Sequence, residues 1–151
     1  MTQVDFYILA ATSAAQRLDF TCRLIDKALR LDKRVFVATA DRRQSAELDQ
    51  LLWTFRPQSF IGHSCSTDRG SDGELEPSPV LISHAGEAGD HHELLINLGA
   101  ETPACFSRFE RLAEVVVQLP AVLQATRDNY AFYRHRGYPI QSHDLRGKAP
   151  G

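Results

Sequence analysis

Two hydrophobic periodicities alternate along the first third of the chain. Short apolar runs of strand length lie at Val4–Leu9 and Arg34–Thr39, and each is followed by apolar residues at helical spacing, over Ala14–Leu31 and Asp41–Phe55. Parallel strands need a crossover between them, and helices of this length supply it. The pattern therefore predicts an α/β fold with a mostly parallel central sheet flanked by helices.

The rest of the chain is less regular. Gly, Ser, Pro and Asp are abundant over Gly62–Pro79, which predicts a long surface loop. A helical turn is expected near Phe106–Leu112. Pro120 is favourable as a first helical residue and Gly137 is a stop signal, so a last helix is expected from Pro120 to about Arg136. Further apolar runs predict strands at Val80–Ile82, Glu93–Leu98 and Glu114–Leu119. We expect one domain over residues 1–145 and a flexible tail over residues 146–151.

The helix expected at Asp41–Phe55 directs its largest side chain away from its apolar stripe. Asp41 and Gln44 form a capping-box start, and the stripe then comprises Leu48, Leu51, Leu52 and Phe55. At about 100° per residue, Trp53 lies about 140° from Leu48. A second large aromatic residue, Phe60, follows soon after. Aromatic residues are enriched at protein interfaces, so Trp53 and Phe60 predict a binding surface; burial of Trp53 by a loop or another helix is the alternative.

The last predicted helix carries two neighbouring stripes. The core stripe contains Val122, Thr126 and Tyr133, and the lateral stripe contains Leu123, Arg127, Tyr130 and Arg134. The lateral stripe mixes apolar and cationic groups, which suits a short peptide that carries an apolar side chain and a carboxylate. A solvated flank with extended arginine side chains is the alternative interpretation.

Composition and charge narrow the possible functions. The 151 residues are 43% hydrophobic and 24% charged, as in a globular domain, and the formal net charge is −2. A protein whose main task is to bind nucleic acid is normally basic, so DNA contact is expected to be indirect or weak. From Arg127 onwards five Lys or Arg residues face two acids, which favours a small anionic partner at this end.

Motifs for chemistry are absent from the sequence. There is no GxGxxG, no GxxxxGK[ST] and no GxSxG, so the sequence lacks a nucleotide-binding loop and gives catalysis no specific support. His91, His92 and Glu93, and the pair His63 and Cys65, lack the spacing of a metal site. We expect no cofactor and no metal.

Two further functions stay open. One is a nucleotide- or phosphate-binding α/β enzyme with an atypical loop, in which Thr12 and Ser13 at a helix N-terminus hold the phosphate. The other is stacking of single-stranded DNA on aromatic residues near the C-terminus, which are Tyr130, Phe132, Tyr133 and Tyr138. Three widely spaced cysteines, of which Cys22 and Cys105 are expected in the core, favour a reducing compartment. With no signal segment and no membrane span in the sequence, we expect a cytoplasmic location.

Several blocks of the sequence resemble one known family in order along nearly the whole chain. They are FYIL near the start, LDQLLWTFRPQSFIGH (Leu48–His63), ELLINLG (Glu93–Gly99), FSRFERLAEVV (Phe106–Val116) and RDNYAFYRHRGY (Arg127–Tyr138). They are similar to the chi subunit of the bacterial DNA polymerase III holoenzyme. The resemblance implies a single Rossmann-like α/β domain and a non-catalytic accessory role in the clamp-loader assembly.

The resemblance also implies partners. Trp53 and Phe60 align with residues that bind the psi subunit, on a surface linked to a repair helicase as a competing partner. Arg127, close to Tyr130, aligns with the site for the acidic C-terminal tail of single-stranded DNA-binding protein (SSB), which ends in a phenylalanine carboxylate. Leu123 and Ala131 are apolar where family members can carry lysines, so Arg134 or Arg136 is expected to compensate.

Overall fold

The computed structural model describes residues 1–55, 63–65, 79–85 and 88–147. Its helices are α1 (Ala14–Arg30), α2 (Arg42–Phe55) and α3 (Pro120–His135), with a short 3-10 turn η2 (Phe106–Arg108). Its strands are β1 (Gln3–Ile8), β2 (Val35–Ala38), β3 (His63–Cys65), β4 (Val80–Ser83), β5 (Leu94–Asn97), β6 (Arg111–Val116) and β7 (Ile140–Asp144).

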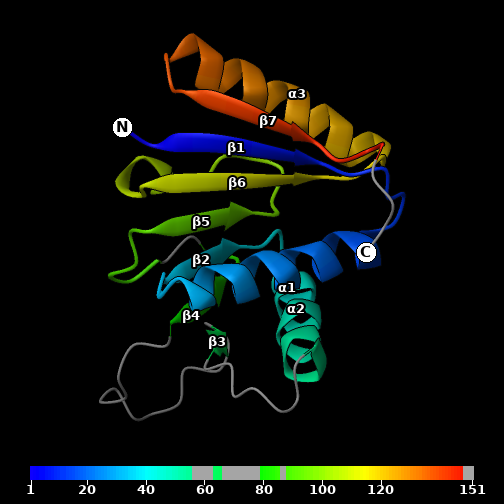
Figure 1. Cartoon of the computed structure of the whole chain (residues 1–151), viewed down its shortest axis with the longest axis vertical. Coiled ribbons are helices and arrows are strands. Elements are labelled where there is room, and N and C mark those ends of the chain that lie inside the picture. The colour runs from blue at the N-terminus through cyan, green and yellow to red at the C-terminus, as the bar shows by residue number, and fades with distance from the viewer. Residues whose placement is uncertain (56–62, 66–78, 86–87, 148–151) are drawn as a thin grey trace.

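The strands form one sheet in the order β3-β4-β2-β5-β6-β1-β7, and every pair is parallel. Figure 1 shows the strands stacked in this order, with α1 in front of β2, α2 nearer the β3 end and α3 beside β7. Successive parallel strands require crossovers, and the three helices lie in those from β1 to β2, from β2 to β3 and from β6 to β7. The predicted α/β fold with a parallel sheet is confirmed.

The core has one apolar cluster on each face of the sheet. Side chains alternate along a strand, so Val35 and Val37 of β2 pack with α1 and α2, whereas Phe36 packs on the opposite side with α3. β6 alternates in the same way: Ala113 and Val115 belong to the α1 side, and Leu112 and Val116 belong to the α3 side. Glu114 lies between these last two, so its carboxylate points beneath α3.

The predicted helix starts are confirmed by their caps. The N–H of Gln44 donates to Asp41 Oδ1 at 2.8 Å, and Gln44 Oε1 accepts from the N–H of Ala40 at 2.7 Å. α1 begins with the N-cap Ser13, whose Oγ accepts from the N–H of Gln16 at 3.2 Å. These bonds satisfy backbone donors that the first helical turn leaves without partners.

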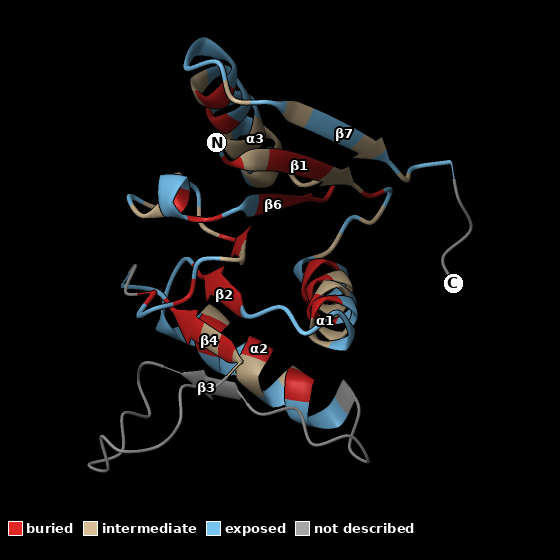
Figure 2. Cartoon of the chain, turned by 60° about the vertical axis from the view of Figure 1, so that its left-hand side comes forward, coloured by how far each residue is buried: buried red, intermediate tan, exposed pale blue. Residues whose placement is uncertain are grey.

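The structure corrects four expectations. β3 occupies part of the predicted loop Gly62–Pro79, and β7 was not predicted at all. The strand expected at Glu114–Leu119 runs over Arg111–Val116 instead, and the expected helical turn is confined to η2. Charged residues inside β6 and polar residues along β7 hide the apolar pattern by which strands are recognised, and Figure 2 shows how exposed β7 is beside the buried β1. Within the described residues, no helix is both long and apolar enough to cross a bilayer.

Candidate functional site

The lateral stripe predicted on the last helix forms one flank of α3, which we call the cationic flank: Leu123, Arg127, Tyr130 and Arg134. Both arginines are exposed, Leu123 is half-buried, and Tyr130 is 37% exposed. The Tyr130 ring packs against Phe6 of β1, with 5.5 Å between ring centroids. The sheet thus fixes one side of the tyrosine ring and leaves the other to solvent. The flank therefore combines a fixed aromatic surface with two cations.

The two arginines of the cationic flank have no ion pair or hydrogen bond within the described part of the chain. Some other exposed arginines are paired; Arg43, for example, contacts Glu47 at 3.1 Å. Arg136 lies on the opposite flank of α3, with its guanidinium carbon 4.5 Å from the Phe132 ring centroid. Arg134, and not Arg136, therefore shares a flank with Arg127. Two unpaired cations about two helical turns apart make a surface that attracts carboxylates.

A buried polar network that the sequence did not predict supports α3 from below. Glu114 Oε2 accepts hydrogen bonds from Tyr133 Oη at 2.6 Å, Asn97 Nδ2 at 3.1 Å and Asn129 Nδ2 at 3.4 Å. Glu114 is 3% exposed and Tyr133 is fully buried. Burial raises the pKa of Glu114 to about 7, although these three hydrogen bonds and nearby Arg17 act in the opposite direction. Desolvation of the charged carboxylate dominates because water has no access to it.

The network connects α3 to two neighbouring strands. Asn97 ends β5, Glu114 lies in β6, and Tyr133 belongs to α3. Thr102 Oγ1 also donates to Tyr133 Oη at 3.0 Å, and Asn129 Nδ2 donates to the Ala100 carbonyl at 3.3 Å. These bonds limit sliding and rotation of α3 on the sheet, and so they set the direction of the cationic flank. A glutamate within the apolar run of β6 was the sequence signal for this network.

The second predicted surface lies on α2. Leu48 and Leu52 are buried against the sheet, as the helical stripe predicts, and Trp53 is 51% exposed. Its exposure means that neither a loop nor a helix of the described residues covers the ring fully. Phe60, predicted to share this surface, lies outside the described residues. The wide exposure of a single tryptophan is typical of an interface residue.

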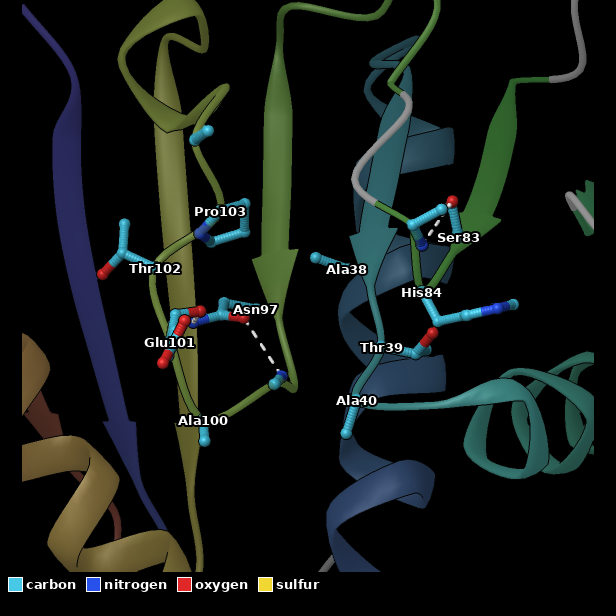
Figure 3. A pocket seen from close by; sticks show the side chains of 13 residues that line it. Ala38, Thr39, Ala40, Ser83, His84, Asn97, Ala100, Glu101, Thr102 and Pro103 are labelled. Carbon is cyan, nitrogen blue, oxygen red and sulfur yellow. Dashed lines mark hydrogen bonds between the residues drawn. The ribbon is translucent and has the colours of Figure 1, made fainter.

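A cleft of about 560 Å³ opens at the carboxyl ends of β2, β4 and β5. Ligands commonly bind at such an edge in parallel α/β folds. Figure 3 shows Asn97 pointing toward the backbone of its own loop, where its Oδ1 accepts from the N–H of Gly99 at 3.0 Å. Ser83 Oγ likewise accepts from the N–H of Ala85 at 3.1 Å. Among the described residues that line the cleft there is no Lys or Arg, so these residues offer no cation for a phosphate group.

The two functions left open from the sequence gain no support. The N-terminus of α1 is closed by its own residues, because Gln16 Oε1 accepts from the N–H of Thr12 and from Ser13 Oγ. A phosphate there would have to displace both bonds. Tyr133 is fully buried, so the expectation that it stacks on single-stranded DNA is wrong. Phe132 is stacked beneath Arg136.

The structure also shows the surroundings of the histidines that were considered as metal ligands and of the cysteines. His91 is buried and His92 is exposed, so adjacent histidines point in different directions. Among the described residues, no group of three or more His, Cys, Asp or Glu side chains is arranged to hold a metal. Cys22 is buried as predicted, and burial raises the pKa of its thiol to about 12, which suppresses the reactive thiolate. Cys105 is half-buried and its pKa is also raised, mainly by burial.

Comparison with known proteins gives one consistent family. The family profile described as "DNA polymerase III chi subunit, HolC" matches residues 1–141. A DNA polymerase III subunit chi of Pseudomonas aeruginosa is 43% identical over 145 residues, which cover 96% of this chain and 98% of the relative. Subunits chi of Haemophilus influenzae and Escherichia coli are 26% and 24% identical over 93% and 94% of this chain, and 96% and 97% of their own lengths. The chain therefore belongs to the family of DNA polymerase III chi subunits.

Proposed function

We propose that this chain is a non-catalytic accessory subunit that connects the clamp loader, through the psi subunit, to the C-terminal tail of SSB. Its membership of the chi family supports a role in DNA replication. The observation that carries the proposal is the cationic flank, where unpaired Arg127 and partly exposed Tyr130 lie side by side on α3. The flank has the chemistry needed for an acidic peptide that ends in an aromatic residue.

Each group of the flank has a role in this proposal. Arg127 pairs with the terminal carboxylate of the tail, and Arg134 attracts its acidic residues. Leu123 and Tyr130 contact the terminal phenylalanine ring, with Tyr130 held in place by Phe6 of β1. Aromatic contact and a charge-assisted hydrogen bond at one point give a weak but selective site.

The psi subunit binds on the other surface, through Trp53 and Phe60. Support comes from the exposure of Trp53 on a helix whose opposite side is anchored by Leu48 and Leu52. A rigid helix that carries an exposed aromatic residue is the usual form of an interface anchor. A repair helicase that competes with psi would use this same surface, not the cationic flank.

The test is a fluorescence-anisotropy titration of a labelled SSB C-terminal peptide. We expect binding by the wild type at low salt and a loss of roughly tenfold or more in Arg127→Ala, since a charge-assisted hydrogen bond contributes about 1.5–3 kcal/mol. Arg42→Ala, an exposed arginine at the start of α2, is the matched control for the change in net charge and should bind like the wild type. Failure of the wild type to bind, or equal loss in both variants, would refute the tail site.

A further inference from the structure

The strand β7 leaves one edge of the sheet open. It pairs with β1 and is the last strand in the sheet order, with no described strand on its other side. The N–H of Leu145 donates to the Ile8 carbonyl at 2.8 Å. Backbone groups of successive residues point alternately to the two edges of a strand. The odd-numbered residues of this segment, like Leu145, therefore bond to β1. The residues of opposite parity, Ile140, Ser142 and Asp144, direct their N–H and C=O groups outward.

The cationic flank lies on the β7 side of α3. On the opposite flank, Asn129 bonds to the Ala100 carbonyl and Phe132 packs on Phe106, both in the segment between β5 and β6. In the other direction, Tyr130 packs on Phe6 of β1, the neighbour of β7. Figures 1 and 2 both show α3 and β7 together at the same end of the molecule. The open strand edge and the two unpaired arginines therefore border one region.

The direction of α3 and the spacing of its two arginines relate the cationic flank to the open edge of β7. α3 carries the chain from the end of β6 back to the start of β7, so it runs antiparallel to β7. Arg127 therefore lies toward the carboxyl end of β7, and Arg134 lies toward Ile140. Seven residues of helix rise about 10 Å, which equals about three residues of extended chain.

Charge decides what kind of chain fits this edge. Arg127 and Arg134 have no acidic partner among the described residues, which favours an acidic strand over a neutral or basic one. The one acid of the outward-directed set, Asp144, is paired with Arg146 at 2.7 Å, and this arginine holds the pKa of Asp144 at about 2. The paired arginine offsets the repulsion that Asp144 would exert on an acidic chain.

We infer that the acidic tail bound by the cationic flank adds to the sheet as an extended strand along β7, parallel to it. The inference rests on the proposed function and specifies how that partner binds. The terminal carboxylate lies at Arg127, and an acidic residue about three positions upstream lies at Arg134. Main-chain hydrogen bonds to the outward groups of β7 provide affinity, and alternate side chains of the tail face α3.

A proline substitution tests the strand edge directly. Ser142→Pro removes one outward N–H and leaves the bonds between β7 and β1 intact, and proline is tolerated on an edge strand at such a position. We expect Ser142→Pro to weaken binding of the labelled peptide roughly tenfold, as for one lost hydrogen bond. The matched control Ser142→Ala keeps the N–H and should bind like the wild type.

A second measurement does not depend on the folding of a variant. A single N-methyl group is moved along the last six residues of the peptide, and each peptide is titrated with wild-type protein. Strand addition predicts a loss of affinity at every second position, because only alternate peptide N–H groups point toward β7. If Ser142→Pro unfolds, the N-methyl series by itself tests whether the tail adds to the sheet as a strand.

The outcomes separate the inference from the proposed function. Absence of wild-type binding overturns both. A flat N-methyl series, together with equal binding by Ser142→Pro and Ser142→Ala and a loss in Arg127→Ala, keeps the tail site and overturns the strand addition. Light scattering that shows a dimer in the wild type and a monomer in Ser142→Pro would give the β7 edge to a second copy and would also overturn it.

Discussion

The two helices that carry the proposed partner surfaces are held on the sheet by different interactions. α2 is held by apolar packing, in which Leu48 and Leu52 fill one core cluster. α3 also packs on apolar residues, but its position is fixed by hydrogen bonds that converge on the carboxylate of Glu114. Apolar packing is insensitive to pH and tolerates small rotations, whereas a hydrogen-bonded network has direction and can be titrated.

The difference corresponds to what each surface is proposed to recognise. An aromatic anchor such as Trp53 gains most of its binding energy from area removed from water, so small changes in helix orientation cost little. A pair of arginines that must meet carboxylates about 10 Å apart needs a helix in a fixed orientation. The buried network beneath α3 provides that orientation.

The largest expected difference between the two helices is in how the stability that their packing contributes depends on pH. The pKa of Glu114 is raised from 4.5 to about 7 in the folded protein, mainly by burial. The folded chain then keeps a proton that the unfolded chain has lost, so the free energy of unfolding decreases as pH rises from about 4.5 to about 7. The difference between the two pKa values corresponds to on the order of 3 kcal/mol.

Urea denaturation at pH 4.5 and pH 7.5 measures this effect. Glu114→Gln is the control, because its amide does not titrate and retains much of the hydrogen bonding with Tyr133, Asn97 and Asn129. The stability of the wild type should fall more steeply with pH than that of the variant. Parallel pH profiles would mean that folding does not raise the pKa of Glu114.

Truncation of the aromatic anchor on α2 should have the next largest effect. Trp53→Ala removes a ring that psi is proposed to bury, at a cost on the order of 2 kcal/mol. Isothermal titration calorimetry should therefore show psi binding weakened roughly thirtyfold. Thr54→Ala, the exposed neighbour on α2, should bind psi like the wild type, and the SSB peptide should bind Trp53→Ala unchanged. Wild-type psi affinity in Trp53→Ala would remove this residue from the interface.

The salt dependence of partner binding should differ between the two surfaces, with a smaller effect than the truncation of Trp53. Exposed charges are screened within about 10 Å at 0.1 M salt, so peptide binding to the cationic flank should weaken roughly tenfold between low salt and 0.3 M salt. Psi binding at Trp53 should change much less over the same range. Parallel titrations of the two partners give the comparison. Equal salt slopes would show that the two surfaces use the same kind of interaction.

The smallest expected effect compares two arginines of α3. Arg134→Ala should weaken peptide binding roughly threefold, because an exposed charge pair contributes about 0.2–1 kcal/mol. Arg136→Ala should leave binding unchanged, since its guanidinium lies over Phe132 on the opposite flank. Anisotropy titrations of both variants at low salt provide the measurement. A larger loss in Arg136→Ala would place the peptide on the other side of α3.

Local pattern was sufficient for much of the architecture. The alternation of apolar strands with amphipathic helices predicted the α/β fold, and the caps at Ser13 and Asp41 lie in short sequence motifs whose bonds form within a few residues. Helical periodicity likewise predicted the exposure of Trp53 and the shared flank of Arg127 and Tyr130. Each of these features depends on residues close together in the chain, which is why sequence alone could determine them.

Tertiary structure decided the features that depend on distant residues. β7 is a polar strand at the edge of the described sheet, and only its pairing with β1, more than a hundred residues away, makes it a strand. Glu114 is stable when buried only because Asn97, Asn129 and Tyr133 meet it from two other elements. The rotation of α3 on the sheet, which places Tyr130 of the cationic flank against Phe6 of β1, was likewise decided by the tertiary structure. That rotation follows from long-range packing and buried hydrogen bonds, which no local pattern in the sequence encodes.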